Sequence, residues 1–256
     1  MLTKEAGWKA PPGSRSRPMV IAHRGGSHLA PENTLAAFRK AVEVGADAIE
    51  LDVRLTRDRR VAVFHDRRVD RTTSGSGTVG SLTMEELRSL DAGSWYGREY
   101  AGECVPSLED VFEAVPEEFP VYVEMKARGP NGFSLAKAVV DVVRRYRRWD
   151  STMVASFNPW GTLWVRAWEK RIVRGYIWAR RHPLPLRARW FGPLVDAQWL
   201  APDRDTFSAS LLCRSHSRGK RVAALDTDVG RDMTSLKEMG LDGVVTDDPV
   251  ELARGR

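Results

Sequence analysis

The chain has 256 residues, of which 42% are hydrophobic and 29% charged, enough for one sizeable globular domain. The 40 basic and 34 acidic residues give a net charge of +6, which favours anionic partners. No helix-turn-helix, zinc-finger or RNA-stacking motif accompanies this charge, so we do not expect nucleic acid as a partner. The two distant cysteines exclude a disulfide scaffold, and no apolar run reaches the roughly 18 residues of a membrane span.

The first 18 residues mix charge, Gly and Pro. They lack the apolar segment of a secretory signal, so we predict a mobile tail over residues 1–18 and a cytoplasmic protein.

Short β-rich runs alternate with helical patterns from residue 19 onwards. Strands are expected at Met19–His23, Ala48–Leu55, Val121–Met125, Met153–Ser156, Arg174–Trp178, Leu194–Gln198, Arg221–Leu225 and Gly243–Thr246. Such alternation indicates a parallel sheet, and the chain length suits a closed barrel. We therefore predict an α/β fold, a single (β/α)8 TIM barrel over residues 19–256. An open doubly wound sheet is the alternative.

Several helices carry start signals. Asn33-Thr34 opens one that Gly45 closes, and capping boxes are expected at Thr83 with Glu86 and at Ser107 with Asp110. The surplus of arginine is interpreted as mostly solvated surface. Four of these arginines, Arg144, Arg145, Arg147 and Arg148, fall on one predicted helix.

One further β run, Val61–Phe64, follows the second strand too closely for a crossover helix, so we predict a hairpin. The stretch 66–106 is rich in Gly, Ser, Thr and Asp and is expected to be an insertion in the barrel. It carries a short helix near Met84–Leu90 and an aromatic loop at Trp95-Tyr96.

Charged residues follow the apolar strands where a barrel enzyme carries its chemistry, at the carboxyl ends. Glu50 and Asp52 share one face of their strand, and Glu124 and Lys126 share one face of theirs. Three carboxylates without cysteine describe a site for a hard cation, Mg2+ or Ca2+. Salt bridges to the many arginines are the structural alternative.

Two histidines, His23 and His65, fall at the same expected site. A hairpin loop of two or four residues would put His65 across from Glu50, and a turn shifted by one residue would put it across from Asp52. An odd loop would send it to the other face. Paired histidines beside a cation suit acid–base catalysis near neutral pH.

These residues give the chain a specific resemblance. His23-Arg24-Gly25, Pro31-Glu32-Asn33-Thr34, Glu50-Leu51-Asp52, His65-Asp66 and Val123-Glu124-Met125-Lys126 resemble, in order, the motifs of the glycerophosphodiester phosphodiesterases. Later segments are similar to the same family, among them Asp91–Trp95, Val105–Glu109, Ser156–Asn158 and Asp242–Asp247.

The resemblance implies hydrolysis of glycerophosphodiesters to glycerol 3-phosphate and an alcohol. It implies that Glu50, Asp52 and Glu124 hold one divalent cation and that His23 and His65 are the acid–base pair. Arg24 and Lys126 would bind phosphate oxygens. The Pro31–Thr34 motif is interpreted as positioning a helix start, and Trp95 as lining the substrate pocket or packing under its own loop.

The last third departs from the family pattern. Ala223-Ala224-Leu225-Asp226 stands where the family has Trp-Thr-Val-Asn, and Ala201-Pro202 stands where it has His-Pro. We expect these changes to bear on which alcohol the substrate carries, and not on the class of reaction.

Trp160, Trp164 and Trp168 fall four apart and therefore on one helical face. We favour packing on the barrel, with peripheral contact to a membrane surface as the alternative.

The alternative functions are lysophospholipase D-type cleavage of lipids and a barrel that binds a phosphoester without turnover. The sequence does not indicate an oligomeric state.

Overall fold

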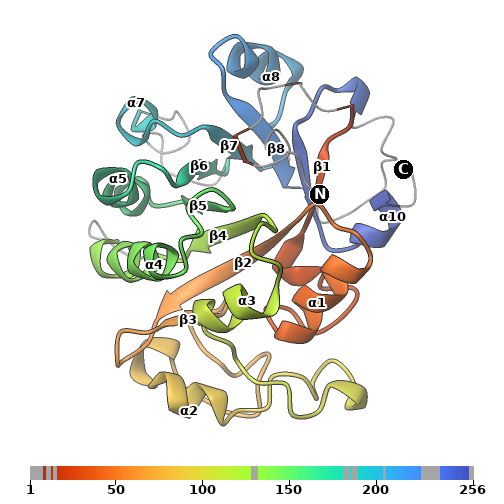
Figure 1. The fold of residues 1–256 in the computed structure, drawn as a ribbon, viewed down its shortest axis with the longest axis vertical. Helices are drawn as coiled ribbons and strands as arrows, with labels where there is room; N and C mark the ends of the chain where they lie inside the picture. The colour runs from red at the N-terminus through yellow and green to blue at the C-terminus, as the bar shows by residue number, and fades with distance from the viewer. Residues whose placement is uncertain are drawn as a thin grey trace.

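A computed structural model describes residues 8–9, 13, 16–127, 132–180, 185, 190–203, 206–225 and 237–253. Its sheet runs in the order β1-β9-β8-β7-β6-β5-β4-β2-β3, and β1 also pairs with β2, so eight parallel strands close into a barrel (Figure 1). The predicted TIM barrel is therefore confirmed, and the open sheet is excluded. The barrel strands are β1 (Met19–Ala22), β2 (Ala48–Leu55), β4 (Val121–Met125), β5 (Thr152–Ser156), β6 (Val173–Trp178), β7 (Trp199–Pro202), β8 (Arg221–Leu225) and β9 (Gly243–Thr246).

Helices cover the outside of the barrel (Figure 1). They are α1 (Leu35–Glu43), α3 (Leu108–Ala114), α4 (Phe133–Arg145), α5 (Pro159–Trp168), α7 (Gly192–Val195), α8 (Ala209–His216) and α10 (Pro249–Ala253). The expected helix starts are confirmed, because the Thr34 hydroxyl accepts from the Ala37 N–H and both capping boxes form. No helix in the described part of the chain is long and apolar enough to cross a bilayer.

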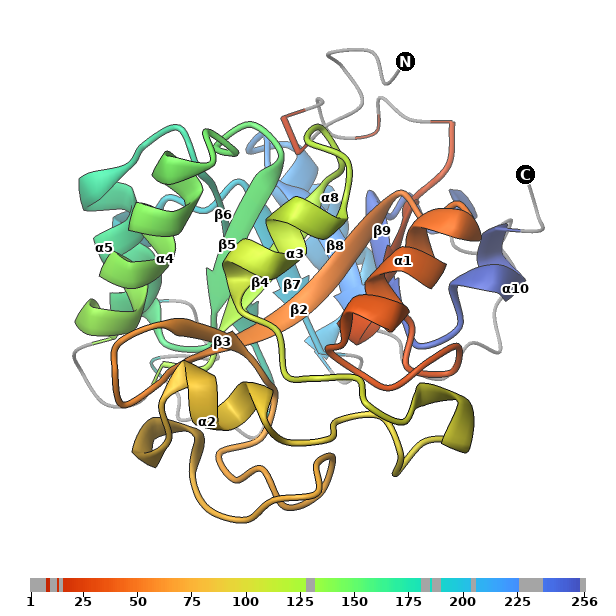
Figure 2. The same cartoon turned by 60° about the horizontal axis from the view of Figure 1, so that its bottom comes forward.

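The predicted hairpin is also confirmed. Strand β3 (Val61–Val63) runs antiparallel to β2, with Val53 opposite Val63. The insertion that follows carries the 3-10 turns Val79–Ser81 and Arg98–Tyr100 and the helix α2 (Met84–Arg88). It lies beneath the end of the barrel toward which β2 and β4 run, as Figure 2 shows.

One strand prediction is wrong. Leu194–Gln198 was expected as a strand, but Leu194 and Val195 lie in α7, and β7 begins only at Trp199. Pro193 at the start of α7 has the fixed φ that suits the first helical turn, which explains the helix.

Trp8 closes the floor of the barrel, at the end opposite the insertion. Its side chain is fully buried, and its Nε1 donates to the Ser151 carbonyl at 3.0 Å. Its ring meets those of Tyr122 and Trp199 edge-on, at centroid distances of 6.3 and 5.4 Å. The expectation of a mobile tail over residues 1–18 therefore does not hold at Trp8.

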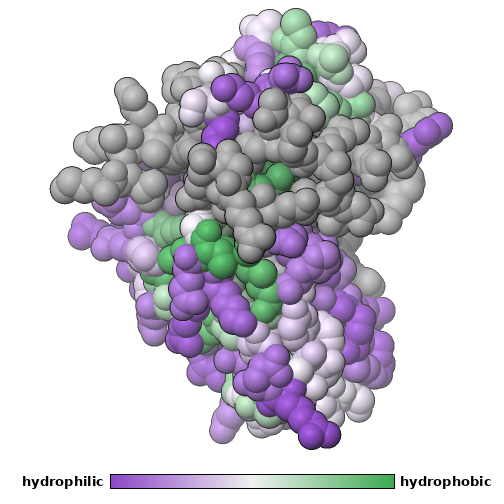
Figure 3. Space-filling view, turned by 90° about the vertical axis from the view of Figure 1, so that its right-hand side faces the viewer, coloured by the Kyte–Doolittle hydropathy of each residue, from purple (hydrophilic) through white to green (hydrophobic). Residues whose placement is uncertain are grey.

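The arginine surplus is not all surface. Hydrophilic side chains cover most of the coloured surface of the face in Figure 3. Arg148, however, is only 2% exposed, and its guanidinium donates to the carbonyls of Phe112 and Glu117 at 3.2 and 3.0 Å. Arg148 thus satisfies backbone acceptors at and beyond the end of α3, so its interpretation as solvated surface is wrong.

Candidate active site

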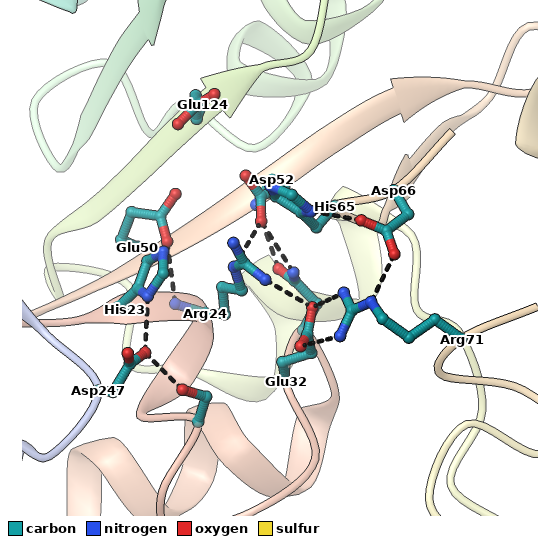
Figure 4. Close-up of polar contacts among 12 residues, drawn as sticks. His23, Arg24, Glu32, Glu50, Asp52, His65, Asp66, Arg71, Glu124 and Asp247 are labelled. Carbon is teal, nitrogen blue, oxygen red and sulfur yellow. Dashed lines mark hydrogen bonds and ion pairs between the residues drawn. The ribbon is translucent and has the colours of Figure 1, made fainter. Parts of the chain in front are cut away.

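Three carboxylates meet at the carboxyl ends of two neighbouring strands. Glu50 and Asp52 lie two residues apart on β2, and the register places Asp52 beside Glu124 on β4. One oxygen from each of the three lies within 4.8 Å of the others. The sequence-predicted ligand set is thus brought to one place (Figure 4).

These carboxylates are buried, so their charges are not solvated. Burial and the nearby charge of Asp52 raise the pKa of Glu50 to about 8. Burial and the charge of Asp52 also raise the pKa of Glu124, although Lys126 partly opposes this. For Asp52, burial is outweighed by the charges of Lys126, His65 and Arg24, which together lower its pKa.

The donor set fits a divalent cation. Oδ1 of Asp52 is buried and receives no hydrogen bond of good geometry, although the Lys126 ammonium lies 2.8 Å away. The same ammonium contacts Glu124. A cluster of oxygen donors that already draws in one cationic group is suited to Mg2+ or Ca2+.

His23 directly follows β1 and is held by Asp247, which directly follows β9. Its Nδ1 lies 2.6 Å from Oδ1 of Asp247, which also accepts from the Ser27 hydroxyl. Burial lowers the pKa of His23, but the hydrogen bond to Asp247 and the charge of Glu50 outweigh that effect and raise it. His23 therefore holds its proton more firmly than a free imidazole does.

His65 reaches the site by a route the sequence did not predict. The hairpin loop, Arg57–Arg59, has an odd length and neither expected register occurs, because Val53 pairs with Val63. Strand β3 ends at Val63, and the last backbone bond of the pairing runs from the Phe64 N–H to the Asp52 carbonyl at 2.8 Å. His65 lies beyond it and is not bound by the alternation of the ladder. Its ring lies beside Asp52 in Figure 4.

A carboxylate also anchors the second imidazole. Nδ1 of His65 lies 2.7 Å from Oδ1 of Asp66, whose Oδ2 accepts from Nε of Arg71 at 2.6 Å. Burial lowers the pKa of His65, and Lys126 and Arg24 lower it further, against the opposing charge of Asp52. His65 therefore holds its proton less firmly than a free imidazole does, the reverse of His23.

Arg24 lies between the two histidines in a strained backbone conformation with φ of 51°. Its backbone N–H donates to Glu50 Oε2 at 2.9 Å, and its guanidinium donates to Glu32 at 2.8 Å. Gly25, at φ of 87°, lets helix α1 approach closely, because a Cβ there would lie 2.7 Å from that of Ala37. Together they hold the guanidinium toward the carboxylates.

The Pro31–Thr34 motif does more than start a helix. Glu32 bridges Arg24 and Arg71, and the Asn33 side chain donates to Asp52 Oδ2 at 3.0 Å while accepting from the Asp52 N–H. The purely structural interpretation was therefore incomplete. Asn33 adopts φ of 59°, a conformation that asparagine tolerates better than most residues.

Sequence reasoning assigned no role to Asp247, Asp66 or Glu32. The position of Asp247 was the available signal, because it directly follows β9, which pairs with β1 in a closed barrel. Asp66 and Glu32 belong to the His65-Asp66 and Pro31–Thr34 motifs, and Arg71 from the insertion contacts both of them.

The two remaining expected substrate-binding residues, Lys126 and Trp95, lie in different surroundings. Lys126 joins the carboxylates. Trp95 lies on the insertion, 43% exposed, with its Nε1 bonded to the Ala92 carbonyl of its own loop, so a substrate contact by Trp95 stays a prediction. Of the departures in the last third, Ala201 and Pro202 lie in β7, and Asp226 lies outside the described residues.

Comparison with known proteins points in one direction. Residues 23–251 match the model of the glycerophosphoryl diester phosphodiesterase family. A glycerophosphodiester phosphodiesterase of Caldanaerobacter subterraneus is 35% identical over 91% of this chain and 96% of its own length. A phosphodiesterase of Oleispira antarctica, solved in complex with its product sn-glycerol-3-phosphate, superposes with a TM-score of 0.85 at 30% identity, covering 93% of this chain and 96% of the other. A glycerophosphodiester phosphodiesterase of Agrobacterium tumefaciens gives a TM-score of 0.75 at 29% identity, over 93% of this chain and 99% of its own.

Proposed function

The chain belongs to the glycerophosphoryl diester phosphodiesterase family, and on that premise we propose that it hydrolyses glycerophosphodiesters to glycerol 3-phosphate and an alcohol, using one divalent cation and two histidines. The observation that carries the proposal is the pair of carboxylate-anchored imidazoles, His23 and His65, beside a buried cluster of three carboxylates.

Glu50, Asp52 and Glu124 would hold the cation, Mg2+ or Ca2+. When bound, such an ion neutralises charge on the phosphoryl oxygens as it develops. Arg24 and Lys126 would bind further phosphate oxygens. Since a phosphodiester carries a single negative charge, this set of cationic groups is sufficient to neutralise it.

The opposite pKa directions of the two histidines support an assignment of roles. His65, whose pKa is lowered, would accept the proton of the nucleophile, which is water or the neighbouring glycerol hydroxyl. His23, whose pKa is raised, would donate a proton to the leaving alkoxide. As the P–O bond to the nucleophile forms, the P–O bond to the alcohol breaks.

The insertion would be part of the catalytic unit. Asp66 and Arg71 both belong to 66–106, and they hold His65 in place. We therefore treat residues 19–256 as one functional domain rather than a barrel with a separable appendage.

Release of glycerol 3-phosphate from glycerophosphocholine and glycerophosphoethanolamine, with and without a chelator, tests the proposal. Activity should be lost with the chelator and restored by Mg2+ or Ca2+. His23→Ala and His65→Ala should each lower kcat by about 100-fold or more while leaving the fold intact. Chelator-resistant turnover would remove the cation from the mechanism, and turnover near wild type in either variant would remove that histidine.

Peripheral membrane contact is part of the proposal, supported by exposed aromatic side chains. Phe133, Trp160 and Trp190 are 45%, 39% and 63% exposed. Trp160 contacts Phe191 at a ring-centroid distance of 6.0 Å, so the group continues from α5 to α7. The packing on the barrel that the sequence favours for Trp160, Trp164 and Trp168 describes Trp164 and Trp168, which stack on each other, but not the exposed Trp160. Tryptophan is suited to a membrane interface. The cytoplasmic location stays a prediction from sequence.

A further inference from the structure

A cavity of about 520 Å³ opens beside Lys126, between the insertion and the start of α4. Its charged lining consists of three cationic side chains, Arg54, Arg67 and Lys126. No acidic residue is among the described residues that line it. The uncharged walls come from Leu55, Thr78–Gly80, Ala127 and Gly132–Leu135.

The cavity adjoins the reaction centre. Lys126 lines it and at the same time contacts Asp52 and Glu124 of the carboxylate cluster. Arg54 lies two residues after Asp52 on β2, and its Nε and Nη2 donate to the backbone carbonyl of His65 at 2.9 and 2.5 Å. A phosphodiester held at the carboxylate cluster would therefore have one of its two ester substituents next to this cavity.

The helix that borders the cavity adds positive potential. Helix α4 has 13 residues, its N-cap is Gly132, which has no side chain to cap it, and its first turn carries no acidic residue. Its first N–H groups, from Phe133 to Leu135, belong to residues that line the cavity. The start of a helix carries partial positive charge, which adds to that of the three cationic side chains.

We propose that this cavity binds a phosphate monoester carried by the leaving alcohol of the substrate. The inference rests on the proposed function and narrows it to glycerophosphodiesters with a phosphorylated head group. A monoester carries a charge near −2 at neutral pH, which Arg54, Arg67 and the helix start can balance, while Lys126 is shared with the scissile phosphate. Such a substrate would bridge the two sites, with Lys126 between its two phosphorus centres.

Glycerophosphoinositol and glycerophosphoinositol 4-phosphate form a matched pair of probes that differ by one phosphate. We expect kcat/KM to be about tenfold higher for the phosphorylated probe, since charge-assisted hydrogen bonds are the strong ones, and the difference should appear mainly in KM. The ratio of the two kcat/KM values is the readout, because loss of folded protein lowers both values equally.

Arg67 is the residue to change, because it lies on the exposed side of the cavity. Arg67→Gln should reduce the ratio to about threefold or less, and Arg67→Glu should reduce it below that. Arg68→Gln is the control: this neighbour is also exposed, is paired with Asp70 at 2.8 Å and does not line the cavity. It should leave the ratio unchanged.

The possible failures are distinguishable. A wild-type ratio at or below one, or a ratio that neither Arg67 variant changes, would overturn the inference while leaving hydrolysis of glycerophosphoinositol in place. Absence of turnover with both probes and with glycerophosphocholine would overturn the proposed function, and this inference with it.

Discussion

The Nδ1 atom of His23 lies 2.6 Å from Oδ1 of Asp247, so a side-chain hydrogen bond links the residues that directly follow the first and last strands of the barrel. A carboxylate in this position fixes the ring and stabilises its protonated form. This relationship, repeated for His65 with Asp66, supplies two tests of the proposed roles.

Asp247→Asn should move the alkaline limb of the pH profile to lower pH by roughly one unit. The Asp247 carboxylate raises the pKa of His23, and an acid catalyst must keep its proton, so a lower pKa ends activity at lower pH. The profile of kcat/KM at saturating cation measures this shift. Movement of the acidic limb instead would make His23 the base.

Asp66→Asn should move the acidic limb of the pH profile of kcat/KM. The hydrogen bond that the Asp66 carboxylate accepts from His65 partly opposes the lowering of the His65 pKa, so its loss lowers that pKa further. A general base works once deprotonated, so the acidic limb should move to lower pH while the alkaline limb stays in place. An unchanged acidic limb would argue against His65 as the base.

Cation binding should release protons in a pH-dependent way. Burial and the charge of Asp52 raise the pKa of Glu50 to about 8, so without the cation Glu50 is mostly protonated at pH 7 and ionised at pH 9.5. Asp52, with its lowered pKa, stays ionised over this range. Since carboxylates bind the ion deprotonated, roughly one proton should leave per ion at pH 7 and fewer at pH 9.5.

Isothermal titration with Mg2+ or Ca2+ in buffers of different ionisation enthalpy counts these protons. Glu50→Gln is the control, and it should release fewer protons at pH 7. Equal release at both pH values would show that Glu50 is not the titrating group.

Trp8→Ala should lower the free energy of unfolding by about 3–5 kcal/mol, because it empties a fully buried site. Trp190→Ala, at a side chain 63% exposed, should change it by about 0.5 kcal/mol or less. Urea unfolding measures both. Similar values for the two variants would contradict a floor closed by Trp8.

Anionic vesicles should co-sediment the protein, and Trp160→Ala should weaken that binding because its exposed ring is part of the proposed contact. Trp95→Ala is the matched control, since Trp95 is similarly exposed but lies on the insertion. Failure of the wild-type protein to bind would end the proposal of membrane contact.

The carboxylate site could be anticipated because strand periodicity is local. Glu50 and Asp52 share a face whatever the register, and any parallel barrel brings the end of β2 beside that of β4. The route of His65 could not be anticipated, because it depends on β3 stopping at Val63, and the length of a short edge strand is a tertiary property.

Other errors share a cause in long-range contacts. The mobile-tail prediction failed at Trp8 because its partners Ser151 and Trp199 lie 143 and 191 residues away. The strand predicted at Leu194–Gln198 is misplaced because an apolar run at Leu194 suggests it. The actual strand, β7, ends in Pro202, a residue that argues against a strand.

The position of Trp8 also bears on the order of assembly. During synthesis Trp8 leaves the ribosome well before Ser151, whose carbonyl accepts from its indole, and before Trp199 and Arg221, which donate to its backbone carbonyl. Domains generally fold as units once their sequence is available. The ring must therefore wait in the nascent chain, and its docking would mark one of the last events of maturation.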